Sequence, residues 1–355
     1  MSGKLESLII GDLKIKLPII QGGMGVRVSA SSLASAVSNQ GALGVIAAVG
    51  LGEEDNDNGL NYAQRSTQSF IDTIRQARSL TSNPIGVNVM CALTNYDNLV
   101  SAAQDEGIDV IISGAGLPLG LPALIKNKRT KLFPIVSSGR AANIICSTWK
   151  RRYARLPDAI VVEGPLAGGH LGYSREELKD PEHFSLENIL KDVLEVAGKY
   201  TPRIPVVAAG GIYTGADIAK MLKIGASAVQ MATRFVCTNE CDASLEYKKL
   251  YLSSKKEDIV VINSPVGMPG RVIRNKFVER IESGEKIDFQ CFYKCLITCD
   301  PRKVNYCIAK ALVNAYRGDL EHGFAMCGTN AYRIDKIVSV KELIDQLVSQ
   351  AQEAL

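Results

Sequence analysis

The sequence contains neither a membrane-length apolar stretch nor an excess of one charge. No run of about 18 apolar residues occurs in it, which argues against a transmembrane helix. Lys and Arg total 41 against 37 Asp and Glu, a formal net charge of +4. Such a balance gives no reason to expect nucleic acid or a membrane surface as a partner.

Secretion features and histidine are also scarce. The first residues, MSGKLESLIIGDLK, lack the apolar core and cleavage site of a signal peptide. Nine cysteines without such a signal suit a reducing compartment, so we expect a cytoplasmic protein. Only three histidines occur in 355 residues, namely His170, His183 and His322, so the setting of each is informative.

Short apolar runs, by contrast, recur along most of the chain and alternate with segments of helical pattern. Eight such runs in βα alternation predict a closed parallel (β/α)8 barrel, the TIM barrel. A doubly wound open sheet is the alternative, but no GxGxxG motif opens its first helix. The runs are 17–21, 43–49, 85–89, 109–113, 132–136, 159–162, 204–208 and 226–231, and the helices between them are 32–39, 70–79, 98–106, 121–126, 141–154, 186–200 and 216–224.

Glycines and polar residues lie at the carboxyl end of each run. The carboxyl ends of barrel strands share one rim, where active sites of such barrels are built, so we expect these groups to converge. In chain order they are Gln21-Gly22-Gly23-Met24-Gly25, Gly50, Asn88, Gly114-Ala115-Gly116, Ser137-Ser138, Glu163, Ala209-Gly210-Gly211, and Gln230 with Ala232-Thr233-Arg234.

The loop after the sixth run, VVEGPLAGGHLG at 161–172, has the highest density of glycines. Gly164, Gly168, Gly169 and Gly172 indicate a backbone that bends sharply beside something bulky. His170 stands among them, and this segment alone leaves open a loop histidine without chemistry. An imidazole, with a reference pKa of ~6.5, can donate to a developing oxyanion or carry positive charge beside an anion. We therefore take His170 as the candidate catalytic residue.

The loops after the seventh and eighth runs predict a phosphate site. Gly210-Gly211 and Ala232-Thr233 stand where barrel enzymes bind phosphate. Glycine lets backbone N–H groups approach phosphate oxygens, a helix N-terminus adds partial positive charge, and Thr233 could add a hydroxyl donor. Arg234 is adjacent. Two tight turns without a ligand are the alternative.

Three regions are expected. Residues 1–236 form the barrel, 237–330 form a mainly helical cap inserted after strand 8, and 331–355 form a helix that closes on the barrel. Within the cap, 245–252 and 304–316 have helical patterns, and SPVGMPGR at 264–271 is rich in turn residues.

Four cysteines crowd the cap. Cys291, Cys295, Cys299 and Cys307 have the spacing C-x3-C-x3-C-x7-C, and on a helix the first three would share one face. Thiolates so placed could bind an iron–sulfur cluster or zinc, although the spacing is not the common one. Reduced cysteines packed as small apolar groups, or disulfides, remain the alternatives.

Several longer motifs occur in order between residues 17 and 275, namely PIIQGGMG, AVSNQGALGVI, GVNVM, ISGAG, VVEGPLAGGHLG, IPVVAAGGI, GASAVQMATRF and SPVGMPGR. Through them the chain resembles the nitronate monooxygenase (2-nitropropane dioxygenase) flavoproteins and their relatives, the FMN-dependent enoyl-acyl-carrier-protein reductases II. The resemblance implies a barrel that binds FMN without a covalent link and uses His170 as the active-site histidine. It assigns to FMN the residues Gly22, Gly23, Met24, Asn88, Glu163, Gly168, Gly169, Gly210, Gly211, Gln230, Ala232 and Thr233.

The resemblance implies two activities. The longer cap favours oxidation of an alkyl nitronate with oxygen through the flavin. QGGM and GVNVM favour the alternative, transfer of a hydride from NAD(P)H through FMN to an enoyl thioester. From a different class, a flavin-free phosphate-binding isomerase or synthase is a further alternative, as is a non-catalytic binding protein. The expected partner is a small molecule, with a homodimer as an open expectation.

Overall fold

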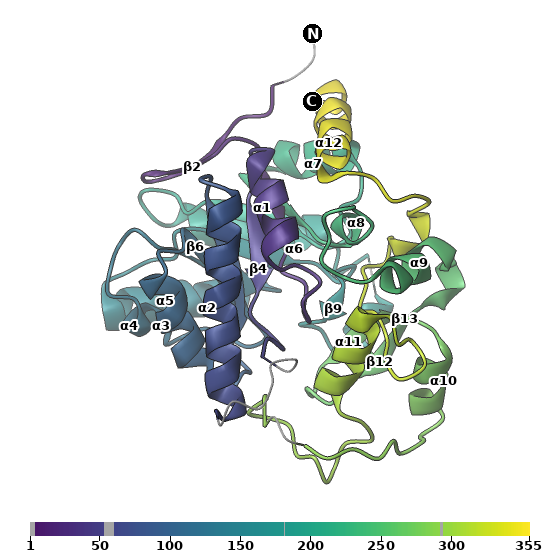
Figure 1. The fold of residues 1–355 in the computed structure, drawn as a ribbon. Helices are drawn as coiled ribbons and strands as arrows, with labels where there is room; N and C mark the ends of the chain where they lie inside the picture. The colour runs from purple at the N-terminus through teal and green to yellow at the C-terminus, as the bar shows by residue number, and fades with distance from the viewer. Residues whose placement is uncertain (1–3, 53–59, 181, 292–293) are drawn as a thin grey trace.

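The computed structural model describes residues 4–52, 60–180, 182–291 and 294–355. Its centre is a barrel of eight parallel strands in the order β3-β11-β10-β8-β7-β6-β5-β4 (Figure 1). A parallel bridge between Ile20 and Leu43 joins the two end strands and closes the ring. The predicted (β/α)8 fold is confirmed and the doubly wound sheet is wrong. The strands are β3 (Ile19–Gln21), β4 (Gly44–Ala47), β5 (Ile85–Met90), β6 (Val110–Gly114), β7 (Lys131–Val136), β8 (Ile160–Glu163), β10 (Val206–Ala209) and β11 (Ala228–Met231).

Helices surround the barrel at the positions that the sequence predicts, and most have recognisable caps. Ser138, Ser185 and Thr214 each accept a hydrogen bond from a backbone N–H in the first turn of the helix that follows. The surrounding helices are α1 (Ser31–Asn39), α2 (Tyr62–Leu80), α3 (Tyr96–Asp105), α4 (Leu121–Leu124), α5 (Gly139–Tyr153), α6 (Leu186–Gly198) and α7 (Gly215–Ile224).

The helix α12 (Val340–Ala354) occupies the place of the eighth outer helix. It packs along α7 and touches α1, and Gln350 accepts a hydrogen bond of 3.0 Å from the N–H of Gly215. The cap is therefore inserted between strand β11 and the helix that would normally follow it. The exact division at 236 and 330 stays a prediction.

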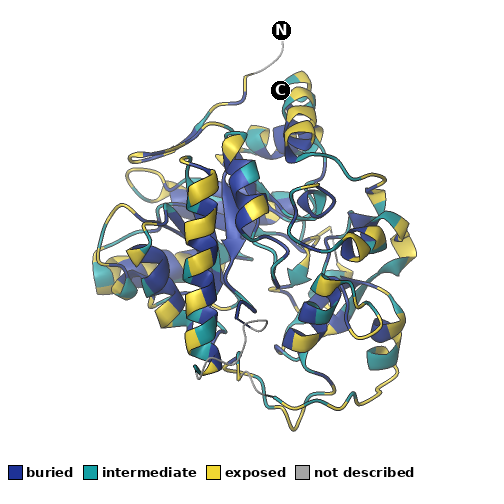
Figure 2. Cartoon of the chain, viewed as in Figure 1, coloured by how far each residue is buried: buried dark blue, intermediate teal, exposed yellow. Residues whose placement is uncertain are grey.

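Alternation along the strands divides the apolar core into two parts. Ile20, Val45 and Phe133 belong to a cluster inside the barrel, whereas Ile19 and Ile46 belong to the cluster between the barrel and the helices. A hairpin of β1 (Leu8–Ile10) and β2 (Leu13–Ile15), which the sequence did not predict, adds four apolar side chains to the inner cluster. Figure 2 shows the buried strands at the centre and the exposed outer faces of the helices.

The cap contains a hairpin of two strands in addition to the predicted helices. After the short helix α8 (Thr233–Val236), its elements are α9 (Leu245–Ser253), β12 (Ile259–Asn263), β13 (Pro269–Ile273), α10 (Lys276–Glu282) and α11 (Ile308–Arg317). The hairpin β12–β13 pairs with the short strand β9 (Gly169–His170) of the barrel. Three short 3-10 helices, Glu177–Lys179, Lys256–Asp258 and Ala331–Arg333, complete the chain. Within the described ranges, no helix combines the length and the apolar character that crossing a membrane requires.

Candidate active site

Two adjoining cavities open at the carboxyl ends of the barrel strands, with volumes of about 430 Å³ and about 120 Å³. All the residues that the sequence assigns to the active site and to FMN line one cavity or both. The large cavity alone is lined by Met24, Gly169 and His170; the small cavity alone by Gly22, Gly210, Gly211 and Gln230; and both by Gly23, Asn88, Glu163, Gly168, Ala232 and Thr233. The predicted convergence on one rim is therefore present in the fold.

The barrel side of both cavities, which we call the floor, is formed largely by backbone. A Cβ added to Gly23 would stand 2.5 Å from the Cβ of Asn88, closer than real side chains come. Gly210 has a φ of +97°, and a Cβ there would stand 2.8 Å from the carbonyl oxygen of Gly164. Glycine is therefore required at both positions, and the floor keeps open the space that a flat or elongated ligand needs.

The small cavity contains a buried acceptor without a partner. The Oε1 atom of Gln230 has no hydrogen-bond donor among the described residues, although Gln230 lines this cavity. Leaving such an atom unsatisfied costs about 1–3 kcal/mol. A ligand with hydroxyl or N–H donors, such as the ribityl chain of a flavin nucleotide, would satisfy it. This unpartnered acceptor therefore fits FMN.

Positive charge stands behind the wall of the small cavity rather than in it. Arg234, which the sequence places next to the phosphate site, packs its guanidinium 4.5 Å from the ring centre of Tyr213. Arg333 packs on the same ring at 4.2 Å, and Tyr213 itself lines the cavity. Arg234 and Arg333 are thus two cations one layer behind the cavity wall, which favour an anion at long range.

His170 is held at the boundary between barrel and cap. Its backbone pairs with Gly270 in the β9–β13 ladder, and its Nε2 lies 2.7 Å from the Oγ of Ser264. Enclosure by apolar neighbours lowers the pKa of His170 to about 4, because burial disfavours the charged form. The imidazole is therefore neutral near pH 7.

Glu163 ends strand β8 between the two cavities. Its side chain lines both cavities and is otherwise enclosed by protein. This burial raises the pKa of Glu163 to about 7, and the nearby positive charge of Arg271 opposes the shift. Arg271 donates hydrogen bonds to the carbonyl oxygens of Pro165, at 2.9 Å, and Ala167. Tyr173 donates to the carbonyl of Glu163 at 2.6 Å. Arg271 and Tyr173 therefore fix the backbone around the carboxyl group.

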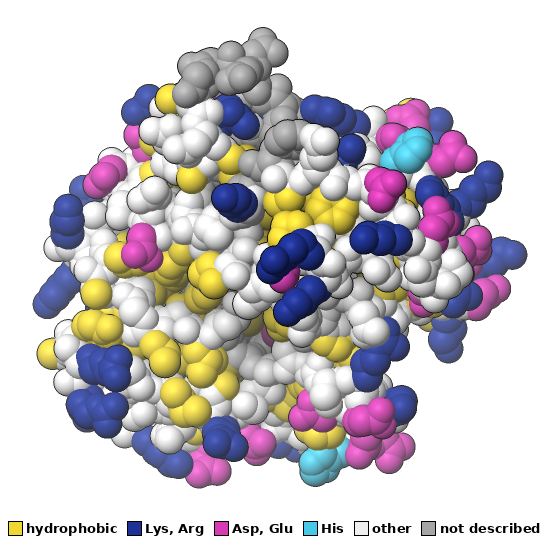
Figure 3. Space-filling model, turned by 90° about the horizontal axis from the view of Figure 1, so that it is seen from below, with side chains coloured by type: hydrophobic (Ala, Val, Ile, Leu, Met, Phe, Trp, Pro, Cys, Tyr) yellow, Lys and Arg dark blue, Asp and Glu magenta, His cyan; other side chains and the backbone are white. Residues whose placement is uncertain are grey.

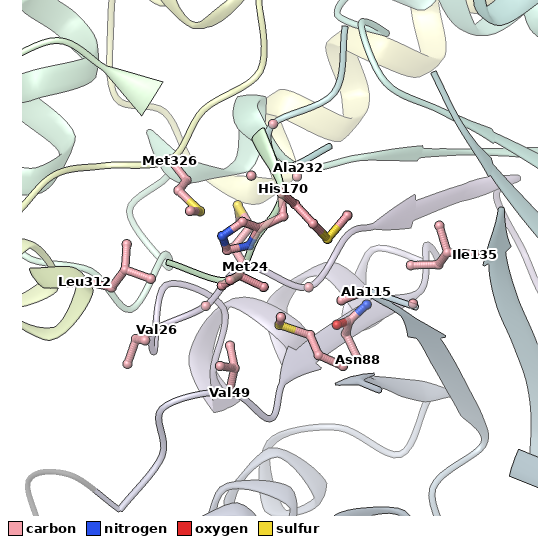
Figure 4. Close-up of a pocket in the computed structure, with 18 of the residues that line it drawn as sticks. Met24, Val26, Val49, Asn88, Ala115, Ile135, His170, Ala232, Leu312 and Met326 are labelled. Atoms are coloured by element: carbon pink, nitrogen blue, oxygen red, sulfur yellow. The ribbon is translucent and has the colours of Figure 1, made fainter. Parts of the chain in front are cut away.

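The cap side of the cavities, which we call the roof, comes from residues 264–268, 308–312 and 326–330. Figure 4 shows Leu312 and Met326 of the roof facing Met24, Val26 and Val49 of the floor, with the His170 ring among them. Seen from below, the molecule presents apolar side chains in a hollowed centre among scattered Lys and Arg side chains (Figure 3). No Lys or Arg belongs to the described lining of the large cavity.

The sequence did not identify most of the roof. Asn330 donates to the carbonyl of Gly211 at 2.8 Å, and the N–H of Gly328 donates to Thr233 at 2.9 Å, so 328–330 close the small cavity. The CGTN segment that contains these residues has no recognisable motif. Ser264 lies in the motif SPVGMPGR. Its contact with His170 could not be predicted from the spacing of the two residues.

The cap cysteines lie in an irregular segment, and metal binding by them stays a prediction. The region 285–307 has no helix among its described residues, so the expected shared helical face is absent there. Cys291 and Cys299 are free thiols, and Cys295 lines the large cavity. The part of the chain that the structure describes contains no group of three or more Cys, His, Asp or Glu arranged to hold a metal ion.

Comparison with known proteins gives a family match along almost the whole chain. The family profile described as "Nitronate monooxygenase" matches residues 6–99 and 92–350. A protein of Staphylococcus saprophyticus called "Probable nitronate monooxygenase" is 25% identical, with 99% of each chain covered. The similarity therefore includes the cap as well as the barrel.

A Mycobacterium tuberculosis protein has a different printed activity. It is called "(3aS,4S,5R,7aS)-5-hydroxy-7a-methyl-1-oxo-octahydro-1H-indene-4-carboxyl-CoA dehydrogenase" and is 30% identical over 273 residues, which cover 77% of this chain and 67% of that protein. The chain thus spans about two thirds of the length of this relative.

Solved structures share the architecture. FabK from Thermotoga maritima superposes with a TM-score of 0.74 at 29% identity, covering 95% of this chain and 93% of that one. Nitroalkane oxidase from Streptomyces ansochromogenes gives 0.73 at 23% identity, covering 96% and 97%. At that lower identity, the second likeness speaks for the fold alone.

Proposed function

Since the chain belongs to the nitronate monooxygenase family, we propose that it is an FMN-dependent oxidoreductase that oxidises alkyl nitronates with molecular oxygen. The observation that carries this proposal is the pair of joined cavities, one bounded by glycine backbone and the other faced by a neutral histidine. The unpartnered oxygen of Gln230 offers a hydrogen-bond acceptor in the small cavity to the hydroxyl groups of a flavin nucleotide. A yellow purified protein with flavin absorbance is the first expectation.

The residues of the floor would hold the cofactor. Gly210, Gly211 and Thr233 would surround its phosphate end, Gln230 would accept a hydrogen bond from it, and Gly23 and Asn88 would lie beside its ring system. Bound there, FMN would supply the redox chemistry, taking electrons from the substrate and passing them to oxygen. The two guanidiniums that pack on Tyr213 would favour the phosphate anion without touching it.

The protein's own contribution would be to bind and orient the substrate and to keep water out. The apolar side chains of Met24, Leu312 and Met326 form walls that exclude water. His170 has a neutral ring facing the large cavity and can hydrogen-bond an oxygen of the substrate. A nitronate is already an anion, so no proton need be removed from its carbon before it is oxidised.

A thioester substrate is the second candidate. The M. tuberculosis relative is named as a carboxyl-CoA dehydrogenase, and a CoA derivative of a carboxylic acid is a thioester. The large cavity also has apolar walls and no fixed cation in its described lining, which suits a neutral acyl group better than a small anion. In that reaction NAD(P)H would reduce the flavin and an enoyl thioester would accept the hydride, with His170 near the carbonyl.

One anaerobic experiment separates the two. The purified protein is mixed in turn with NADH, NADPH and an alkyl nitronate, and the flavin absorbance is followed. Bleaching by the nitronate alone supports the monooxygenase. Rapid bleaching by a pyridine nucleotide, followed by reoxidation with an enoyl thioester, supports the reductase and rejects the first proposal.

A further inference from the structure

The hydrogen bond between Ser264 and His170 links a loop of the barrel to a turn of the cap. Ser264 follows strand β12 and His170 lies in strand β9, 94 residues apart in sequence, with 2.7 Å between Oγ and Nε2. Ser264 is only 8% exposed. The hydroxyl group of Ser264 needs an acceptor for its hydrogen, because a buried O–H without an acceptor is costly in free energy.

The other partner of the hydroxyl settles that direction. The N–H of Val266 lies 3.3 Å from the Oγ of Ser264 and can only donate to it. Among the described residues, Nε2 of His170 is the one acceptor within reach of the Ser264 hydroxyl hydrogen. If Nε2 carried a proton, two N–H groups would point at one oxygen and the buried hydroxyl would have no acceptor. The Ser264 hydroxyl therefore donates and Nε2 accepts.

The second ring nitrogen then carries the proton. With Nε2 as acceptor, a neutral imidazole must be protonated on Nδ1. No protein partner of Nδ1 is found in the described part of the chain, and His170 lines the large cavity. We propose that Ser264 is a positioning residue that locks His170 in the Nδ1–H tautomer, so that the ring offers a hydrogen-bond donor to an oxygen of the substrate.

This assignment deepens the proposed function and rests on it only for the identity of the substrate. An Nδ1–H group can donate to a nitronate oxygen or to a thioester carbonyl, but it cannot accept a proton from carbon. His170 would thus stabilise charge on oxygen rather than act as a general base. Ser264 would act through His170 without touching the substrate.

Nitrogen NMR on the purified protein with its cofactor tests the tautomer directly. With three histidines in the chain, ¹⁵N-histidine labelling gives few signals, and His170→Gln identifies the one to follow. In long-range proton–nitrogen spectra at pH 7, we expect His170 to show a protonated Nδ1 and a bare Nε2. A protonated Nε2, or an imidazolium with both nitrogens protonated, overturns the proposal.

Three variants in and around the turn that contains Ser264 test its role. Ser264→Ala should give a mixture of tautomers and lower kcat/KM about 10-fold, the effect of one hydrogen bond, with flavin absorbance unchanged. Ser264→Thr keeps the hydroxyl and should keep the single tautomer. Thr298→Val removes a 3.2 Å hydrogen bond to the carbonyl of Val266 and should leave the tautomer as it was.

The outcomes also separate this proposal from the proposed function, since the spectra need no substrate. A wild-type tautomer retained in Ser264→Ala contradicts the role of Ser264 even if nitronates are oxidised. An Nδ1–H tautomer that Ser264→Ala abolishes, in a protein inert toward nitronates, supports the positioning role and rejects the nitronate reaction.

Discussion

The floor and the roof of the same cavities are built by different means. The floor is made of strand ends and glycine backbone, where Gly23 and Gly210 leave no room for a side chain. The roof is made of side chains such as Leu312 and Met326, carried on a helix and a loop. The difference teaches that the shape of the backbone suits a ligand that is the same throughout a family, such as a cofactor. Side chains, which substitution can alter, suit a substrate that varies between relatives.

Adding a single methyl group to the floor should have the largest effect. In Gly23→Ala the new Cβ meets Asn88, and such overpacking costs about 1–3 kcal/mol. The dissociation constant for FMN should therefore rise roughly 10- to 100-fold, as flavin fluorescence titration would measure. Gly120→Ala is the matched control, because a Cβ there meets nothing within 4 Å. Equal flavin affinity in both variants would contradict a backbone-built floor.

Removing the imidazole at the boundary of floor and roof should slow turnover strongly but leave cofactor binding unchanged. His170→Ala loses a donor to the substrate oxygen, and kcat/KM should fall about 100-fold while the flavin-to-protein ratio is unchanged. His170→Gln, which keeps an N–H donor, should recover part of this loss. Turnover unaffected by His170→Ala would mean that the pocket binds without catalysing.

Glu163 offers a test of the floor through pH. Its pKa is about 7 in the folded protein, above the 4.5 of an ordinary glutamate, so the folded state binds the proton more tightly. Its contribution to stability is then full below pH 4.5 and is lost as pH rises through 7, by roughly 3 kcal/mol. Glu163→Gln lacks this titration, so urea unfolding should show the variant gaining on the wild type between pH 5 and pH 8. A constant difference at both pH values would argue against a buried carboxyl group.

A change in the roof should alter selectivity by less. Leu312→Ala opens space in the large cavity, and each methylene of a longer nitronate that enters it should gain roughly 4-fold in kcat/KM. Flavin content should stay the same, because Leu312 does not line the small cavity. Leu245→Ala, at a residue 51% exposed, is the control. A loss of flavin in Leu312→Ala would contradict separate roles for the floor and the roof.

The smallest effect is expected from the cap cysteines outside the cavities. Neither Cys291 nor Cys299 lines a cavity, and both are free thiols. The double variant Cys291→Ser/Cys299→Ser should keep its flavin content and should turn over within about 2-fold of wild type, in line with surface changes of ±0.5 kcal/mol. Iron bound stoichiometrically to the wild type and lost from the variant would contradict this.

The barrel and its floor could be predicted from sequence because they follow from local patterns. Each strand is a short buried run, and the residues at its carboxyl end lie on the common rim. The positions of Gly210, Gln230 and Glu163 could therefore be predicted from the sequence. The packing of Arg234 on Tyr213 could not be predicted in this way, because it depends on side-chain directions that a spacing does not give.

The roof could not be predicted because its contacts join distant parts of the chain. Ser264 meets His170 across 94 residues, and Asn330 meets Gly211 across 119. The cysteine segment is irregular, and the N–H of Ile297 donates there to the carbonyl of Ala92, more than 200 residues away in sequence. Tertiary contact, rather than local propensity, decides the structure there.

The position of α12 has a consequence for how the molecule is made. Because this helix fills the gap between α7 and α1, the outer helical layer stays incomplete on the ribosome until the entire inserted cap has been translated. Docking of α12 then completes this layer around the closed ring of strands.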